Sequence, residues 1–271
     1  MQPRRRAQGV WSRAEFREMR LADSEARQGR SCAAPARAGG PDGRGEARLA
    51  SPRPAAAAQI SCPVCLGPHG RLFCRADARD YWRCADCGAR FLDPAQRPAA
   101  DVERAHYRTH DNRTDDPRYR AFLGRLARPL LERLPARQTG LDFGCGPGPA
   151  LAALLREAGH RMALYDPVFF HDEAALARAY DFVTCTEAAE HFHRPSREFA
   201  RLDALVRPGG WLAVMTGFAP ADADFARWHY RRDPTHVVFY GRETLEWLAA
   251  RHGWDCQFPC SDVALMRKRG G

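Results

Sequence analysis

Short apolar runs alternate with helical patterns through the second half of the chain. Each run is long enough for one buried strand, and the segments between and after the runs carry apolar residues at steps of three and four. Strands that alternate with helices are typical of a mostly parallel α/β sheet with helices on its faces. The expected strands are 140–143, 162–165, 181–184 and 211–216, and the expected helices are 150–158, 196–206 and 243–252.

Two further patterns flank this region. Before it, residues 116–134 repeat Tyr, Phe and Leu at helical spacing, which predicts an amphipathic helix. After it, residues 254–269 predict two strands that join near Pro259. The fold class is therefore α/β, with a mostly parallel sheet and an antiparallel final strand. Only 14 residues separate Asp166 from Asp181, so we expect the strand that would lie between them to be short or absent.

The composition changes along the chain and predicts four parts. Residues 1–58 are rich in Ala, Arg, Gly and Pro and offer few large apolar side chains, so we expect a disordered tail. A cysteine-rich module is expected at 59–95, a helical connector at 96–137 and the α/β domain at 138–271.

The net charge of +9 is concentrated in the tail. Residues 1–58 hold twelve Arg and six acids, which gives +6, so residues 59–271 carry only 9 − 6 = +3. No basic cluster stands out there, and we do not expect nucleic acid as a partner. No apolar run reaches membrane-spanning length, and charges interrupt the start where a signal peptide would be apolar. A cytoplasmic protein without membrane contact is expected, while its oligomeric state is not predicted.

Four cysteines in two matched pairs predict a zinc site. Cys62 and Cys65 are followed after 18 residues by Cys84 and Cys87, the spacing of a zinc ribbon with four thiolate ligands. A closed site of this kind is structural. Two disulfides and a redox dithiol are the alternatives, and His69 and Cys74 are alternative ligands.

A glycine-rich loop follows the first predicted strand. The stretch LDFGCGPG, residues 141–148, places three glycines where a ligand could approach the backbone closely. Its spacing departs from the GxGxxG pattern of dinucleotide-binding loops, which disfavours a nicotinamide oxidoreductase. Asp166 ends the next predicted strand, 24 residues after Asp142, where an acid can bind ribose hydroxyls.

These residues resemble a known family. LDFGCGPG is similar to the first motif of class I S-adenosylmethionine-dependent methyltransferases, and residues 180–192 and 205–212 resemble the ubiquinone-biosynthesis O-methyltransferases. The resemblance covers roughly residues 139–255 and is specific for the superfamily, not for a substrate. It implies a Rossmann-like methyltransferase sheet and S-adenosylmethionine as cofactor. The cofactor-binding residues would be Asp142, Gly144, Cys145, Gly146, Gly148, Asp166 and Glu187.

The resemblance also suggests residues for the chemistry. Glu187, Glu190 and His191 match an E-x-x-E-H trio associated with a divalent cation such as Mg²⁺, although they could instead line the cofactor site. His191 and His236 are the candidate catalytic bases, because an imidazole titrates near neutral pH. A structural histidine is the alternative at position 236.

The expected function is methyl transfer from S-adenosylmethionine to an O, N or C nucleophile of a small-molecule acceptor. The alternative is an RNA or tRNA methyltransferase that uses its zinc ribbon to bind nucleic acid. A non-catalytic zinc-bearing adaptor that keeps the fold is a further possibility.

Overall fold

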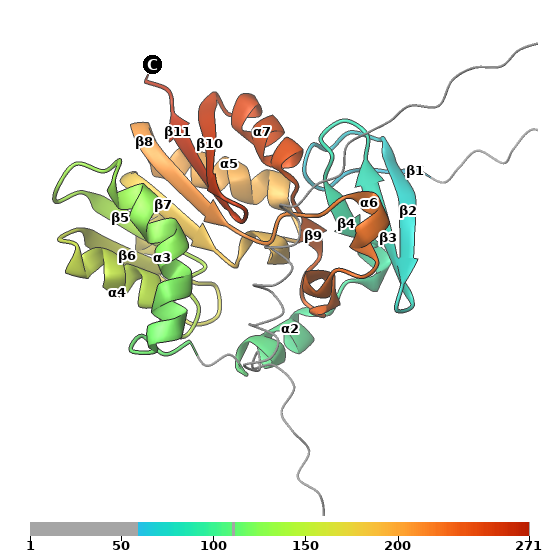
Figure 1. Ribbon diagram of the computed structural model, residues 1–271, viewed down its shortest axis with the longest axis horizontal. Helices are drawn as coiled ribbons and strands as arrows, with labels where there is room; N and C mark the ends of the chain where they lie inside the picture. Colours follow the sequence, from blue (N-terminus) through green and yellow to red (C-terminus); the bar gives the residue numbers. More distant parts are fainter. Residues whose placement is uncertain (1–58, 110–111, 271) are drawn as a thin grey trace, which may run out of the picture. The chain divides into compact units, whose positions relative to one another are not determined.

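The computed structural model describes residues 59–109 and 112–270, so the expectation for residues 1–58 lies outside the described residues. The described residues form two β-sheets with helices around them (Figure 1). No helix among them is long and apolar enough to cross a membrane.

The larger sheet has six strands in the order β10-β11-β8-β7-β5-β6. The four strands β6, β5, β7 and β8 run parallel, whereas β11 pairs antiparallel with β8, and β10 pairs antiparallel with β11. The expected mostly parallel sheet with an antiparallel end is therefore confirmed. The strands are β5 (Thr139–Phe143), β6 (Arg161–Tyr165), β7 (Tyr180–Thr186), β8 (Val206–Met215), β10 (Trp254–Cys260) and β11 (Val263–Lys268).

Two details of this sheet bear on the sequence predictions. In the part of the chain that the structure describes, no strand lies between β6 and β7, and the short 3₁₀ helix Glu173–Ala177 takes that place, as predicted. The two strands expected at 254–269 with a junction near Pro259 are present as β10 and β11; Pro259 itself lies inside β10, and the turn follows it at 261–262. The pairing register shifts between Gln257 and Cys260, and such an irregular position tolerates a proline that has no N–H to donate.

Helices cover both faces of the larger sheet (Figure 1). One face carries α3 and α4, whose apolar side chains form one buried cluster with Met162, Phe182 and Trp211. The other face carries α5 and α7, which pack into a second cluster. The carboxylate of Asp116 caps α3 by accepting a hydrogen bond from the amide of Arg118 at 2.8 Å. The helices are α3 (Pro117–Leu131), α4 (Ala150–Glu157), α5 (Pro195–Leu205) and α7 (Arg242–Arg251).

The smaller sheet combines segments that are far apart in the sequence. Its order is β1-β2-β3-β4-β9, and every neighbouring pair is antiparallel. The last strand comes from far along the chain and pairs with β4 through Phe91 opposite Val238 and Arg90 opposite Phe239. The strands are β1 (Gln59–Ile60), β2 (Gly70–Ala76), β3 (Arg79–Cys84), β4 (Arg90–Leu92) and β9 (Val238–Phe239).

Two short helices complete the part that positions the site. Helix α2 (Ala100–Tyr107) leads from the smaller sheet towards α3, and α6 (Asp222–Phe225) lies between β8 and β9 in sequence. The buried cluster under α5 also contains Tyr81 and Phe91 of the smaller sheet. The two sheets therefore share one apolar core.

Candidate active site

The glycine loop after β5 has no space for a side chain at two of its positions. Gly144 has a φ of +73°, and a Cβ there would lie 2.6 Å from the Cβ of Ala188. At Gly148 a Cβ would lie 1.7 Å from the carbonyl oxygen of Asn112. Cys145, between the glycines, is buried, and this burial raises the pKa of its thiol. The loop therefore lies tightly between the chain before α3 and the residues after β7.

Asp166 lies against this loop at the end of β6. One carboxylate oxygen accepts a hydrogen bond from the amide of Gly146 at 3.0 Å. The other accepts from the amides of Val168 at 2.8 Å and Phe169 at 3.0 Å. The carboxylate is thus fixed beside the glycine loop, where the sequence placed a ribose-binding acid.

Asp142 is buried below the loop. Its Oδ1 accepts a hydrogen bond from the hydroxyl of Thr184 at 2.8 Å. Burial raises the pKa of Asp142 to about 6, although hydrogen bonds from Thr184 and from the amide of Ala152 oppose this increase. The charge of Asp142 therefore changes close to neutral pH.

Two carboxylates after β7 share one hydroxyl group. The hydroxyl of Tyr230 donates to Glu190 Oε1 at 2.5 Å and lies 3.3 Å from Glu187 Oε2. Thr216 donates to the other oxygen of Glu190 at 2.9 Å, and no part of Glu190 is exposed. Glu187 has a φ of +48°, and burial, followed by the charge of Glu190, raises its pKa well above the usual value. This edge of the sheet is therefore rich in buried acidic groups.

His191 and His236 lie next to these acids, with their ring centroids 4.8 Å apart. Nδ1 of His191 lies 3.1 Å from the carbonyl oxygen of Thr235, and Nδ1 of His236 lies 2.7 Å from that of Tyr230. A carbonyl only accepts, so each Nδ1 carries a proton. Both Nε2 atoms lie 4.0 Å from Glu190 Oε1.

The surroundings keep His236 neutral at physiological pH. Its side chain is buried, and this burial, followed by the neighbouring His191, lowers the pKa of His236 to about 4. Asp233 lies 3.9 Å from Nε2 and Glu190 lies 4.0 Å away, and both oppose that decrease. A neutral imidazole with a free Nε2 can accept a proton from a bound molecule.

The trio proposed for Mg²⁺ does not form as a set. Among the described residues, Glu190 and His191 gather with His236, with ligand atoms within 4.8 Å of one another, and Glu187 is not part of this group. Magnesium prefers oxygen ligands, whereas this group offers two imidazole nitrogens and one carboxylate. The residues therefore do not fit the Mg²⁺ prediction.

The four predicted zinc ligands do come together. Their sulfur atoms form one group, with Cys62 and Cys87 3.6 Å apart and Cys65 and Cys84 3.4 Å apart. Four thiolates around zinc at about 2.3 Å would be about 3.8 Å apart, so the arrangement is close to a tetrahedral site. None of the four forms a disulfide. Cys74 is outside the group.

His69, the other alternative ligand, also lies outside the sulfur group. Its Nδ1 lies 2.9 Å from the carboxylate of Asp86 instead.

The chain segment that carries Tyr230 and His236 is attached to the cysteine-bearing sheet. The buried guanidinium of Arg90 on β4 contacts Asp222 at 2.7 Å and Glu243 at 3.2 Å. Arg231, also buried, contacts Asp77 of the β2–β3 turn at 2.8 Å. The cysteine-bearing sheet therefore holds this segment in position.

Some residues of the candidate site were not predicted from the sequence. The sequence contains no motif that would identify Asn112 or Thr216 as part of the site. The carbonyl oxygen of Asn112 lies against Gly148, and the hydroxyl of Thr216 donates to Glu190. Tyr230 lies in the stretch 228–240, which is rich in aromatic residues. The pattern did not show that its hydroxyl would join two carboxylates.

Comparison with known proteins identifies the family of this chain. Residues 105–257, more than half of the chain, match the family model described as "Methyltransferase domain". The chain therefore belongs to the methyltransferase-domain family, whose members are enzymes that transfer methyl groups. A curated relative, the ubiquinone biosynthesis O-methyltransferase of Sodalis glossinidius (strain morsitans), is 33% identical over 86 residues, which cover 32% of this chain. The chain spans about a third of that relative's length (34%).

Solved structures with a similar chain trace include two from Burkholderia thailandensis. One is a 1,6-didemethyltoxoflavin-N1-methyltransferase with bound 1,6-didemethyltoxoflavin and S-adenosylhomocysteine (18% identity, TM-score 0.47, covering 73% of this chain and 99% of that chain). The other is an O-methyltransferase family protein (20% identity, TM-score 0.41, covering 58% of this chain and 61% of that chain). The family membership rests on the family match and not on these likenesses.

Proposed function

We propose that the protein is an S-adenosylmethionine-dependent methyltransferase that acts on a small-molecule acceptor. The observation that carries this proposal is the 3.0 Å hydrogen bond between the Gly146 amide and the Asp166 carboxylate. It joins the acid that we propose to bind the ribose to the backbone of the glycine loop that we propose to bind the methionine end. Both residues lie within the matched part of the chain.

The donor site uses the carboxyl ends of β5, β6 and β7. The loop that contains Gly144, Cys145, Gly146 and Gly148 holds the methionine end of the donor, with Asp142 below it. A carboxylate accepts about four hydrogen bonds. Asp166 accepts three from the backbone, so one position remains for a ribose hydroxyl. Glu187 adds a carboxylate to the same edge.

The acceptor site uses the two histidines and their acidic neighbours. The donor supplies a methyl group that is electrophilic because it is bonded to a sulfonium, so the protein mainly aligns the acceptor. Nε2 of His236 receives the proton that the acceptor's O–H, N–H or C–H group loses, and the Tyr230 carbonyl keeps the ring in the required tautomer. Glu190 and Asp233 face Nε2 and stabilise the imidazolium that results. His191 lines the same position and is the second candidate base.

Zinc is the metal that best fits the four-cysteine group. Cys62, Cys65, Cys84 and Cys87 would hold it with no open position, so its role is structural. Because β4 follows this site and pairs with β9, the zinc also fixes the segment that carries His236.

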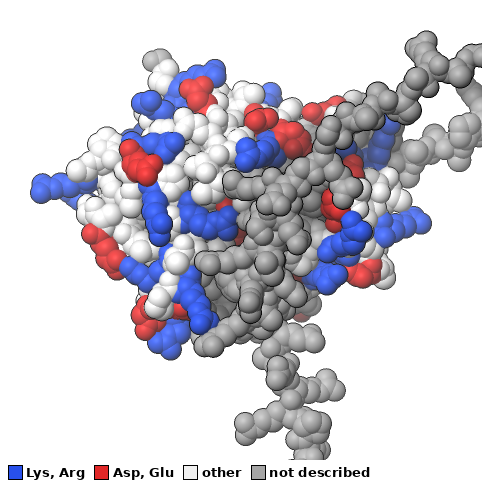
Figure 2. Space-filling model, viewed as in Figure 1, with Lys and Arg blue, Asp and Glu red and all other residues white. Residues whose placement is uncertain are grey.

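A small molecule is favoured over RNA by the surface charge. Acidic side chains lie among the basic ones on the face seen in Figure 2. RNA-binding proteins instead concentrate basic residues on one face. The residues from 59 onwards carry a net charge of only +3 (the chain's +9 less +6 for residues 1–58).

The test is methyl transfer from a labelled donor to a cell extract with the full chain. We expect label in small molecules that pass a filter, unchanged by nuclease treatment. Calorimetry with S-adenosylhomocysteine should show binding to one site. Label that disappears with nuclease would favour the RNA alternative. Donor binding without any transfer would favour the adaptor, and absence of donor binding would overturn the proposal.

A further inference from the structure

A cavity lies at the opposite end of the larger sheet from the glycine loop. It has a volume of about 220 Å³ and is formed around the amino ends of β5, β6 and β7 and the start of β8. The loop follows the carboxyl end of β5, which is roughly 13 Å from the amino end for a strand of this length. This cavity is therefore not part of the donor site.

The short connection between β6 and β7 leaves this region of the sheet without a full helix. Thr139 and Arg161 are on the same face of the sheet as Leu141 and Ala163, because side chains alternate along a strand. That face carries α5 over β7 and β8, but only the 3₁₀ helix Glu173–Ala177 lies between β6 and β7 in sequence. The cavity opens at this point.

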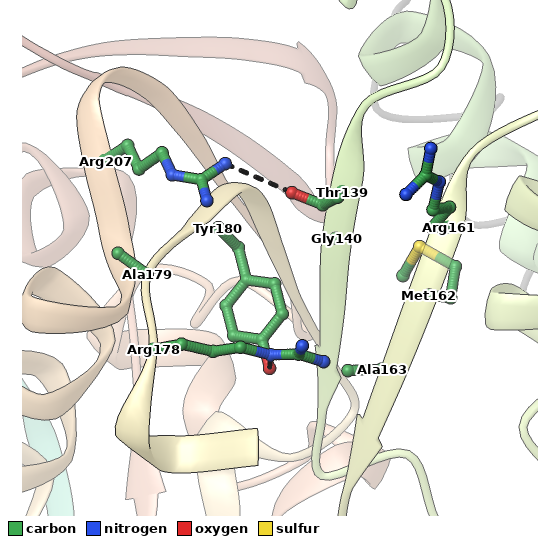
Figure 3. A pocket seen from close by; sticks show the side chains of 9 residues that line it. All are labelled: Thr139, Gly140, Arg161, Met162, Ala163, Arg178, Ala179, Tyr180 and Arg207. Atoms are coloured by element: carbon green, nitrogen blue, oxygen red, sulfur yellow. Dashed lines mark hydrogen bonds between the residues drawn. The ribbon is translucent and has the colours of Figure 1, made fainter. Parts of the chain in front are cut away.

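The lining is basic and contains no acidic residue. Arg161, Arg178 and Arg207 surround the cavity, as Figure 3 shows, and six uncharged residues complete it. The charge of Arg207 is balanced by Asp181, at 2.5 Å. The carboxylate of Asp181 also accepts two hydrogen bonds from Thr139, so its oxygens are bound by neighbouring residues of the protein. Within the described ranges, no carboxylate forms an ion pair with Arg161 or Arg178.

Arg178 is held in place at the cavity. Its Nε donates to the hydroxyl of Tyr180 at 3.0 Å, and its guanidinium lies 5.2 Å from the centre of the same ring. The hydroxyl of Tyr180, a buried residue, donates in turn to the carbonyl of Ala175 at 2.8 Å. The two Nη groups remain available for a ligand, and a fixed side chain loses less entropy when it binds one.

We propose that this cavity binds the phosphate group of a small phosphate monoester, at a site separate from the donor cleft. Guanidinium groups match the oxygens of a phosphate closely, because they donate parallel hydrogen bonds. The uncharged part of the lining, which includes Tyr180 and Ala163, accommodates the organic part of the ligand. The volume restricts that part to the size of a single sugar, since drug-sized ligand pockets start at about 300 Å³.

The test is calorimetry on the full chain at constant ionic strength, with ribose 5-phosphate, inorganic phosphate and ribose as probes. We expect saturable binding of ribose 5-phosphate and no binding of ribose. Binding of inorganic phosphate with equal affinity would show that the phosphate group alone supplies the recognition, and weaker binding would show that the sugar also contacts the cavity. Both results support the site.

Three variants test whether ribose 5-phosphate binds in this cavity. Arg178→Gln and Arg161→Gln should each weaken it about tenfold, through loss of a charged hydrogen bond. Arg71→Gln removes the same charge from exposed β2 and should change it by less than about twofold. Thermal unfolding of each variant controls for folding, and saturating S-adenosylhomocysteine should not displace the probe.

Three results would overturn the inference. They are no saturation up to about 10 mM probe, equal weakening by Arg71→Gln, and displacement by S-adenosylhomocysteine. The first two exclude a specific cavity site, and the third would assign the phosphate to the donor cleft. None of them bears on methyl transfer, so the proposed function stands or fails separately.

Discussion

Nδ1 of His236 donates a hydrogen bond to the carbonyl oxygen of Tyr230 at 2.7 Å, and the hydroxyl of the same tyrosine donates to Glu190 at 2.5 Å. Tyr230 therefore fixes both the tautomer of the proposed base and the position of the carboxylate that faces it. The free Nε2 is the atom on which the proposed proton transfer depends.

Replacing this imidazole tests that role. His236→Gln should lower the rate of methyl transfer by about 10²–10⁴-fold, the usual contribution of a general base. The affinity for S-adenosylhomocysteine should stay within about twofold, because His236 does not lie at the glycine loop. His69→Gln, a change at an exposed histidine, is the matched control. If donor affinity falls in parallel with the rate, His236 supports the fold and does not act as the base.

The rate should also depend on pH in a defined direction. Since the pKa of His236 is lowered to about 4, Nε2 is unprotonated throughout the neutral range. We expect this group to leave the rate constant unchanged between pH 6 and 8 and to reduce it only as the pH approaches about 4. A loss of rate with an apparent pKa near the ordinary histidine value would assign the proton to another group.

Asp142 should couple donor binding to pH. Its pKa is raised to about 6, so the folded protein favours the neutral acid. The resulting stabilisation is fully present below the ordinary pKa of an aspartate and is lost as the pH rises through about 6. A cationic donor favours the ionised form, so its affinity should increase over the same interval.

The measurement is donor affinity by calorimetry from pH 5 to 8. Asp142→Asn should remove the dependence near pH 6, and it should also remove the loss of stability that accompanies ionisation. Asp172→Asn, at an exposed helix cap, provides the control. An unchanged pH profile in Asp142→Asn would mean that another group titrates.

Asp166 should contribute directly to donor affinity. Asp166→Ala removes the proposed acceptor of a ribose hydroxyl, and we expect binding to weaken by about 1–3 kcal/mol. The variant also frees three backbone amides, so its thermal unfolding must be measured alongside. Asp172→Ala serves as the control. Unchanged affinity in a folded Asp166→Ala protein would remove this residue from the donor site.

Metal analysis tests the cysteine group. The purified chain should contain one zinc per molecule, and Cys84→Ser should lose it, whereas Cys74→Ser should retain it because Cys74 lies outside the group. Binding of structural zinc contributes roughly 10–16 kcal/mol in small domains, comparable to the stability of a whole domain. We therefore expect a large decrease in the unfolding temperature of Cys84→Ser. Equal metal content in both variants would disprove the four-cysteine site.

The sequence predicted the strands and helices whose formation depends on residues within the element itself. The strands β5 to β8 are apolar runs bounded by glycine, proline or charged residues, and α3, α4, α5 and α7 repeat apolar residues at helical spacing. The missing strand could be inferred because 14 residues cannot contain a helix and a strand with their connections. The cysteine spacing likewise predicted which sulfurs would meet.

The features that the sequence did not predict depend on contacts between distant residues. The pairing of β9 with β4 joins residues nearly 150 positions apart, such as Phe91 and Val238, and a two-residue strand has no periodicity to detect. His236, and not Glu187, lies beside Glu190 and His191, because this pairing brings the segment that contains His236 next to them. The E-x-x-E-H pattern alone therefore suggested the wrong partner.

The pairing of β4 with β9 means that the cysteine-bearing sheet cannot be removed as a separate piece. A shortened protein that began after β4 would expose the backbone of β9 and the apolar faces of Phe239 and Phe225, which now pack against Tyr81. An uncovered strand edge beside apolar rings promotes association between molecules. Attempts to isolate the catalytic half should therefore yield aggregates, and exchange of modules between relatives would have to carry both strands together.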